Sequence, residues 1–202
     1  MKINKALNLV ITVEDEGEIV HVHCAPIRHE IFEKYHRVMA RTFAAIYAEG
    51  MNIIAGPRVA SLMLREIAEE TPRTIRNADG ATSQGNWYEG PDGIENGLMP
   101  EIRRLTNVST FAPEGWRQVP IDVARKMGII GDEAMREIEG QIVFFILASA
   151  MHTGLQRAQM LEAMAGLWGA QITSLNSTEY NSSLQTLIEQ ESTMVPASSI
   201  PS

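Results

Sequence analysis

The feature that most constrains the fold is an uninterrupted apolar run, IVFFILASAM, at residues 142–151. This run covers about half of the roughly 20 residues that a membrane-spanning helix requires, so it fits a helix buried inside a folded domain. The residues before it, from about position 132, are amphipathic. We therefore predict a helix over residues 132–152 whose second half forms the centre of the core.

The N-terminal part of the chain predicts a β-hairpin over residues 6–24. The apolar, β-branched segment ALNLVITV is followed by EDEGE, which breaks the pattern, and then by strict alternation over residues 19–24. Alternation places the valines of the second segment on one face and its histidines on the other. We expect the valine face to be buried and the histidine face to meet solvent.

His21, His23 and Cys24 lie close enough in the sequence to suggest a metal site. The two histidines share one face of the predicted strand, whereas Cys24 points to the opposite face. The three side chains therefore cannot meet at one ion without a bulge, and zinc also requires three or four ligands. We predict no metal at this position.

His29, Glu33 and His36 stand at positions i, i+4 and i+7 of the next predicted helix, a spacing that a metal could use. They lie nearly opposite the apolar stripe of that helix, where a solvated face is expected. A metal-dependent enzyme would need the hairpin histidines to meet this trio, and nothing in the sequence indicates that they do.

Apolar periodicity, with proline and glycine near the segment ends, predicts six helices. They cover residues 27–49, 57–70, 100–107, 120–127, 132–152 and 155–169. Residues 71–96 lose all periodicity and are rich in Gly, Asn, Asp, Thr and Pro, so we predict a long loop that is either functional or disordered. A second loop is predicted over residues 108–119.

The composition changes abruptly at residue 171. Residues 171–202 are rich in Ser, Thr, Asn and Gln and contain no Lys or Arg. We predict that they form a flexible tail and that residues 1–170 form a single globular domain. The predicted fold class is α+β and mainly α-helical, with an N-terminal β-hairpin packed on a bundle of about six helices.

Charge and motifs narrow the classes of function. The formal net charge of −8 disfavours nucleic acid as a partner. The P-loop, dinucleotide-binding, nucleophile-elbow and zinc-protease motifs are all missing from the sequence. A single cysteine cannot form an internal disulfide, and the N-terminus does not have the pattern of a signal peptide. We expect a cytoplasmic protein that does not associate with membranes, is not an enzyme, and uses no cofactor.

Two groups of apolar side chains are candidates for binding a protein partner. The first lies on the helix at 155–169, where Ala and Gly permit close helix approach and Met adapts to irregular surfaces; a tightly packed core helix is the alternative. The second lies in the loop at 71–96, where exposed aromatic residues dock either on a partner or on the chain's own core. The candidates are Met160, Met164, Leu167 and Trp168 on the helix, and Trp87 and Tyr88 in the loop.

Several stretches of the sequence are similar to those of one protein family. They are APIRHEIFEKYHRVMARTFAAIYAEG, AGPRVASLMLREIAEE, GPDGIENGLMPEIRRLTNV, LWGAQITS and the terminal ASSIPS. Taken together, they resemble tail assembly chaperones of long-tailed bacteriophages, over about residues 1–170 and the last few positions. No catalytic residue can be carried over, because that family has none.

The resemblance implies an assembly factor of the host cell cytoplasm that binds the tape measure protein, keeps its long helices soluble and helps to recruit the tail tube protein. A homo-oligomer is expected, and in that family a ribosomal frameshift near the end of the gene often produces a longer form. The alternative is a structural tail component or tail completion protein, which would remain in the mature virion.

Overall fold

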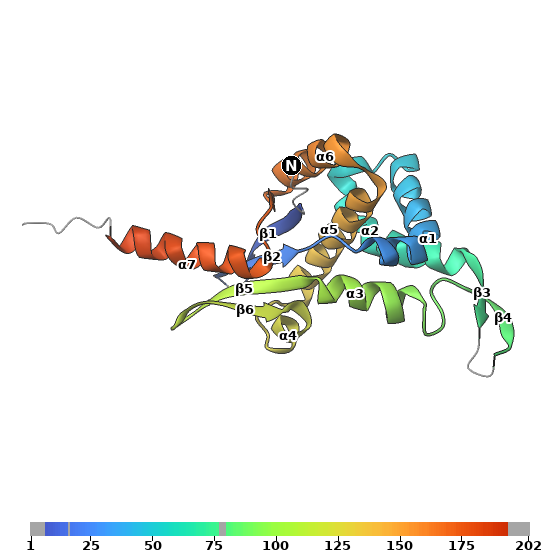
Figure 1. Cartoon of the computed structure of the whole chain (residues 1–202), viewed down its shortest axis with the longest axis horizontal. Coiled ribbons are helices and arrows are strands. Elements are labelled where there is room, and N and C mark those ends of the chain that lie inside the picture. The colour runs from blue at the N-terminus through green and yellow to red at the C-terminus, as the bar shows by residue number, and fades with distance from the viewer. Residues whose placement is uncertain (1–6, 16, 77–79, 194–202) are drawn as a thin grey trace, which may run out of the picture.

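The structure is a computed structural model that describes residues 7–15, 17–76 and 80–193 (Figure 1). It confirms the predicted class, since the fold is α+β, is 58% helical and begins with a β-hairpin. Within the described residues, no helix combines the length and the apolar character that crossing a membrane would require.

A five-stranded antiparallel sheet has the order β6-β5-β2-β1-β7. The predicted hairpin supplies two neighbouring strands of this sheet, and later parts of the chain extend it on both sides. The strands are β1 (Asn8–Asp15), β2 (Glu18–Cys24), β5 (Thr106–Ala112), β6 (Gly115–Pro120) and β7 (Gln171–Thr173).

Each of the six predicted helices is present, and a seventh follows near the C-terminus. A π-helical turn, η1 (Ile94–Leu98), leads into the third helix. The helices are α1 (His29–Ala48), α2 (Asn52–Glu70), α3 (Met99–Arg104), α4 (Ile121–Lys126), α5 (Asp132–Met151), α6 (Gly154–Trp168) and α7 (Ser177–Thr193).

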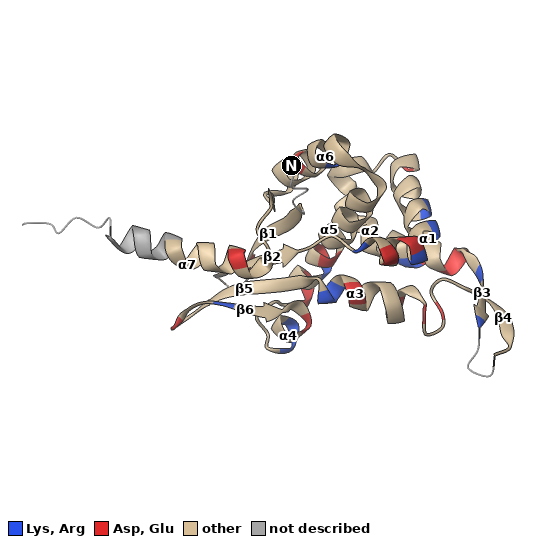
Figure 2. Cartoon of the chain, in the orientation of Figure 1, with Lys and Arg blue, Asp and Glu red and all other residues tan. Residues whose placement is uncertain are grey.

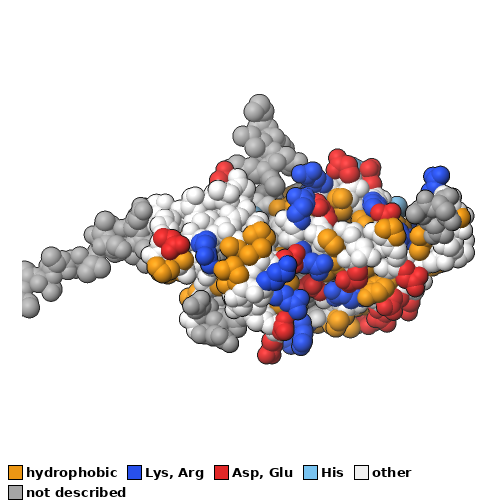
Figure 3. Space-filling view, turned by 90° about the horizontal axis from the view of Figure 1, so that it is seen from below, with side chains coloured by type: hydrophobic (Ala, Val, Ile, Leu, Met, Phe, Trp, Pro, Cys, Tyr) orange, Lys and Arg blue, Asp and Glu red, His pale blue; other side chains and the backbone are white. Residues whose placement is uncertain are grey.

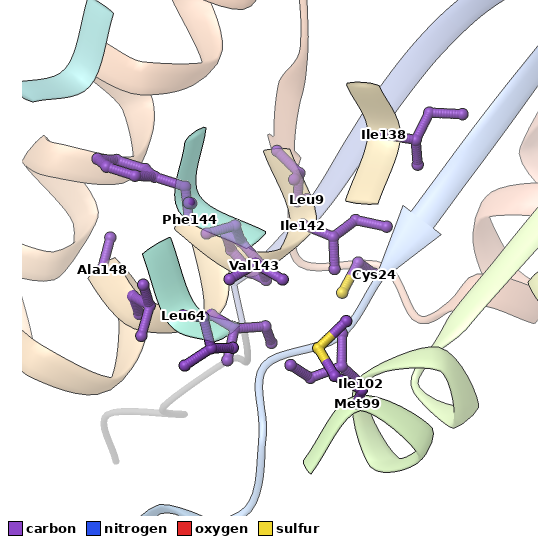
Figure 4. Packing of buried hydrophobic residues seen from close by; sticks show 14 of the residues in the cluster. Leu9, Cys24, Leu64, Met99, Ile102, Ile138, Ile142, Val143, Phe144 and Ala148 are labelled. Carbon is purple, nitrogen blue, oxygen red and sulfur yellow. The ribbon is translucent and has the colours of Figure 1, made fainter. Parts of the chain in front are cut away.

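The apolar run in α5 is the centre of the core, as predicted. All residues from Ile142 to Ser149 are buried, and α5 contacts α1, α2, α3, α6 and β1. Figure 4 shows α5 side chains meeting Leu64 of α2, Cys24 of β2 and Met99 of α3. Because fully burying a large apolar side chain contributes about 1.5–3 kcal/mol, this helix supplies much of the stability of the domain.

The helices α2 and α5 cross at very short range. A Cβ atom at Gly140 of α5 would overlap the carbonyl oxygen of Pro57 in α2, and one at Gly56 would overlap the ring of Phe144. Glycine at these two positions therefore permits a crossing that any side chain would prevent.

The second helix was predicted to begin at Pro57, but α2 begins at Asn52 and contains Pro57 in its interior. Proline has no N–H to donate to the carbonyl four residues earlier, which is that of Ile53. The indole Nε1–H of Trp168 donates to this carbonyl at 2.9 Å. The indole therefore satisfies the carbonyl that Pro57 leaves free, and the helix continues.

The two predicted loops were largely wrong. Residues 71–96 contain a two-stranded sheet, β3 (Pro72–Arg76) and β4 (Thr82–Asn86), which projects from the body as an arm in Figure 1. Residues 108–119 fall mostly within β5 and β6. Both arm strands are largely exposed, so they lack the apolar alternation that identifies a half-buried strand.

The predicted tail at 171–202 was also wrong in its first part, because residues 171–173 form β7 and 177–193 form α7; residues 194–202 lie outside the described residues. A capping box starts α7. The Asn176 side-chain oxygen accepts from the N–H groups of Thr178 and Glu179, and the Glu179 carboxylate accepts from the N–H of Asn176.

Helix α7 covers the outer face of the sheet, so the prediction that both histidines meet solvent was wrong. Tyr180 and Leu184 pack with Val10 in a small second cluster. His23 is only 2% exposed, and its Nε2–H donates to the carbonyl of Leu175 at 3.0 Å. The His21 ring lies between Trp116 and Tyr180, with centroids 5.1 and 5.9 Å away.

This covered face makes stability depend on pH. Burial lowers the pKa of His21 and His23 below the ordinary histidine value, because a charged ring is poorly solvated there. The unfolded chain then binds protons more strongly than the folded chain. The two neutral rings therefore make their full contribution to the free energy of unfolding above about pH 6.5, and this contribution is lost as the pH falls through the lowered pKa values.

When the pH is lowered from about 7.5 to about 5.5, we expect the free energy of unfolding to fall less in His23→Gln than in the wild type, because one buried titrating ring is removed. The control is His36→Gln, on the exposed surface of α1. Urea unfolding at both pH values measures the effect. An equal pH response in wild type and in both variants would contradict the account.

Candidate partner-binding site

The structure does not bring the candidate metal ligands together. His21 and His23 lie on the α7 side of the sheet, and Cys24 is buried on the opposite side, where burial raises the pKa of its thiol to about 12. His29 and Glu33 form an exposed pair on α1, with 3.2 Å between the ring nitrogen and the carboxylate oxygen. No group of three or more His, Cys, Asp or Glu side chains suited to an ion occurs in the described part of the chain.

Trp87 and Tyr88 pack against the chain's own core at the base of the arm. The Trp87 ring lies 5.7 Å from that of Tyr35, and the Arg73 guanidinium lies over it at 4.9 Å. The backbone N–H of Trp87 bonds to the carbonyls of Ala68 and Thr71. These contacts anchor the arm to α1 and α2, which favours the alternative in which the aromatic residues dock internally.

The four candidates on α6 separate into two kinds. Met164 is fully buried and Met160 is partly buried against the core, so the prediction that Met164 faces a partner was wrong. Leu167 is 58% exposed, and Trp168 is partly exposed. The helix thus packs one stripe of side chains on the core, and it presents exposed apolar side chains near both ends, at Leu155 and Leu167.

Trp168 lines two neighbouring hollows. Its indole is fixed by the bond to Ile53 and by edge-to-face packing on Phe144, with ring centroids 5.6 Å apart. Gly169 ends α6 in the left-handed conformation, with φ +64°, and turns the chain towards β7. The side-chain oxygen of Gln141, which lines both hollows, is buried and has no hydrogen-bond partner among the described residues.

The first hollow, which we call the apolar hollow, has a volume of about 460 Å³. Ile54, Pro57, Leu167 and Trp168 supply its apolar lining, and Arg58 and Glu137 add charges of opposite sign. Ile54 is 72% exposed. Sequence reasoning missed this residue because the second helix was predicted to begin three residues after it.

The second hollow, which we call the acidic hollow, has a volume of about 440 Å³ and adjoins the first, since Glu137, Gln141 and Trp168 line both. Residues 11–14 of β1 form one side, and Glu133, Glu137 and Gln141 of α5 form the other. Among the described residues that line it, none is Lys, Arg or His. Figure 2 shows the basic residues mostly on α1, α3, α4 and β3, away from β1.

A third hollow, of about 610 Å³, lies between α3, α4 and α5 and carries charges of both signs. Figure 3 shows this underside of the molecule, where basic and acidic side chains are interspersed. Arg103 pairs with Asp122 at 3.5 Å, and Arg125 pairs with Asp132 at 2.9 Å. Because three basic and three acidic side chains line it, this hollow offers a charged ligand little net attraction.

The apolar hollow has exposed apolar side chains that a protein partner could cover. Burial of exposed apolar side chains by a partner is favourable, and full coverage of a side chain such as Ile54 or Leu167 contributes about 1 to 2 kcal/mol at roughly 0.8 kcal/mol per buried methylene. The rigid indole that lines the hollow with them offers a large contact area at a low entropy cost. Together they form a small anchor site at the junction of α2, α5 and α6.

Comparison with known proteins gave no match that identifies a family: no family model, no curated protein and no solved structure is similar to the chain at a significant level.

Proposed function

We propose that the protein is a non-catalytic assembly factor that binds a partner protein at the apolar hollow, and that it acts as a tail assembly chaperone of a long-tailed bacteriophage in the host cytoplasm. The observation that carries the proposal is the exposure of Ile54 and Leu167, which line one hollow together with the fixed Trp168 indole. Such exposed apolar clusters with a polar rim mark interaction sites.

The position of the hollow also supports the proposal. Two stretches that resemble the chaperone family, AGPRVASLMLREIAEE and LWGAQITS, meet there, because Pro57 and Arg58 belong to the first and Leu167 and Trp168 to the second. A tape measure client would place an apolar side chain of its helix in the hollow. Self-association and contact with the tail tube protein are further parts of the proposal.

Co-expression with the tape measure product of the same phage tests the function. We expect the wild-type chain to raise the soluble fraction of the client and to co-purify with it, whereas Ile54→Glu and Leu167→Glu reduce both at least about tenfold, because each places a charge in a desolvated contact. Circular dichroism checks that the variants fold.

Matched controls exist on the same two helices. Leu62→Glu on α2 and Leu155→Glu on α6 change residues that are equally exposed but lie outside the hollow, and we expect wild-type client yield. Equal losses in all four variants, or no change in any, would refute the proposal. Abundance of the protein in purified mature virions would instead support a structural tail component.

A further inference from the structure

Strand β1 is paired along nearly its whole length on one side only. On its β2 side the register runs from Leu9 to Asp15, whereas β7 pairs only with residues 8–10. In the part of the chain that the structure describes, residues 11–15 have no strand partner on the β7 side. The cause lies in α6, which ends at Trp168 and delivers the chain to the sheet only at Gln171.

An unpaired strand edge presents N–H and C=O groups to which another chain can add. Proteins usually protect such edges with charged side chains, especially lysine, or with proline, a bulge or a covering element; the charges of this segment, Glu14 and Asp15, are acidic and would attract a basic partner strand. The segment ITVED at 11–15 contains neither lysine nor proline, and its pairing with β2 is continuous, without a bulge. Thr12 and Glu14 are exposed at this edge.

The acidic hollow lies directly against this open edge. Ile11 and Val13 face the core, on the side of α5, while Thr12 faces outwards and contacts the ring of His21. Glu133 and Glu137 of α5 therefore lie beside the inner face of any strand added here, and Glu14 lies beside its outer face. A strand at this edge meets carboxylates on both faces.

We infer that the open edge of β1 at residues 11–15 binds an extended segment of a partner protein that carries Lys or Arg, by strand addition beside the acidic hollow. Main-chain hydrogen bonds to β1 supply the pairing, and alternate basic side chains reach Glu133 and Glu137 on one face and Glu14 on the other. The inference rests on the proposed function only in requiring a protein partner, because the edge at residues 11–14 and Glu133 line the acidic hollow alone, whereas Glu137 lines both hollows.

The probe is a short synthetic peptide in which lysine alternates with threonine, compared with one in which glutamate replaces each lysine. We expect the full chain to bind the lysine peptide, with an affinity that falls as salt rises, and to bind the glutamate peptide at least about tenfold more weakly. Backbone amides among Thr12, Val13 and Glu14 that exchange quickly in the free chain are expected to become protected.

Variants of the chain separate this site from general charge effects. Glu137→Lys is expected to weaken binding of the lysine peptide at least about tenfold, whereas Glu69→Lys, an equal charge change at an exposed position of α2 outside both hollows, is expected to leave it within about twofold. Glu133→Lys is expected to have the same effect as Glu137→Lys, and it separates this site from the apolar hollow, because Glu133 lines only the acidic hollow.

Equal binding of the two peptides, equal effects of Glu137→Lys and Glu69→Lys, or unchanged exchange at residues 12–14 would overturn the inference. Failure of the proposed function is distinguishable, because Ile54→Glu and Leu167→Glu alter client yield without removing the strand edge. Conversely, peptide binding that survives those two variants supports the inference independently of the tape measure client.

Discussion

Replacing Gly140 with alanine is expected to lower the free energy of unfolding by about 1–3 kcal/mol, which is the usual cost of overpacking. The new methyl group would overlap the carbonyl oxygen of Pro57, and a backbone atom cannot move aside as a flexible side chain can. The crossing of α2 and α5 would have to open, and Trp168, which bonds to Ile53 of α2, would move with it. Urea unfolding measures the change.

Gly166→Ala is the matched control, because Gly166 lies inside α6, is exposed and has no neighbour near the position of a Cβ atom. Alanine favours the helix over glycine, so this variant is expected to gain about 0.5 to 1 kcal/mol of stability. If both substitutions stabilise the chain, the close crossing of α2 and α5 is not present in solution.

Phe144→Ala is expected to lower the free energy of unfolding by about 3–5 kcal/mol, a larger loss than that expected for Gly140→Ala. The Phe144 ring is fully buried, packs on Gly56 and lies 5.6 Å from the Trp168 ring and 6.3 Å from the Phe43 ring. Its removal leaves a cavity where α1, α2, α5 and α6 meet. Thermal and urea unfolding report the loss of stability.

The control for this prediction is Phe111→Ala in β5, where the side chain is 56% exposed and packs edge-to-face on Trp116. We expect a loss below about 1 kcal/mol, because an exposed ring leaves no cavity and forfeits at most the aromatic pair. Comparable losses for Phe111 and Phe144 would contradict the position of the core.

The elements that were predicted correctly are those in which a single helix or strand has its own clear pattern of apolar residues. The run at 142–151 required burial, and the alternation at 19–24 required a strand with its valines inside. Both features depend on the residues of the segment itself, so no knowledge of the rest of the fold was needed.

Strands β5 and β6 were missed because their burial depends on neighbours that the sequence does not reveal. Thr106, Ser109 and Thr110 are buried although polar, since β5 lies between β2 and β6. The Thr106 hydroxyl donates to the carbonyl of Ile102, and this hydrogen bond allows the polar hydroxyl to be buried. Polar composition therefore indicated exposure where tertiary structure imposed burial.

Helix α7 carried a local signal that composition concealed. The sequence NSTE at 176–179 is a capping box, and Tyr180 and Leu184 stand four residues apart, as one apolar stripe of a helix requires. The abundance of Ser, Thr and Gln masked both signs. The outcome for His21 and His23 followed from this error, because α7 covers their face of the sheet.

Half of the candidate site could be predicted. Leu167 and Trp168 were identified from the apolar character of their helix, and both line the apolar hollow. Ile54 and the open edge of β1 could not be identified, because the first depends on a helix that continues through Pro57 and the second on where β7 stops. These are properties of the assembled fold.

Hydrogen exchange of the purified complex with its tape measure client tests directly whether the client binds at the apolar hollow. We expect slower exchange than in the free chain at residues 52–58 of α2 and 164–168 of α6, which border this hollow. Unchanged exchange in both segments, with protection confined to the arm at 72–86 or to α7, would place the partner elsewhere and contradict the account.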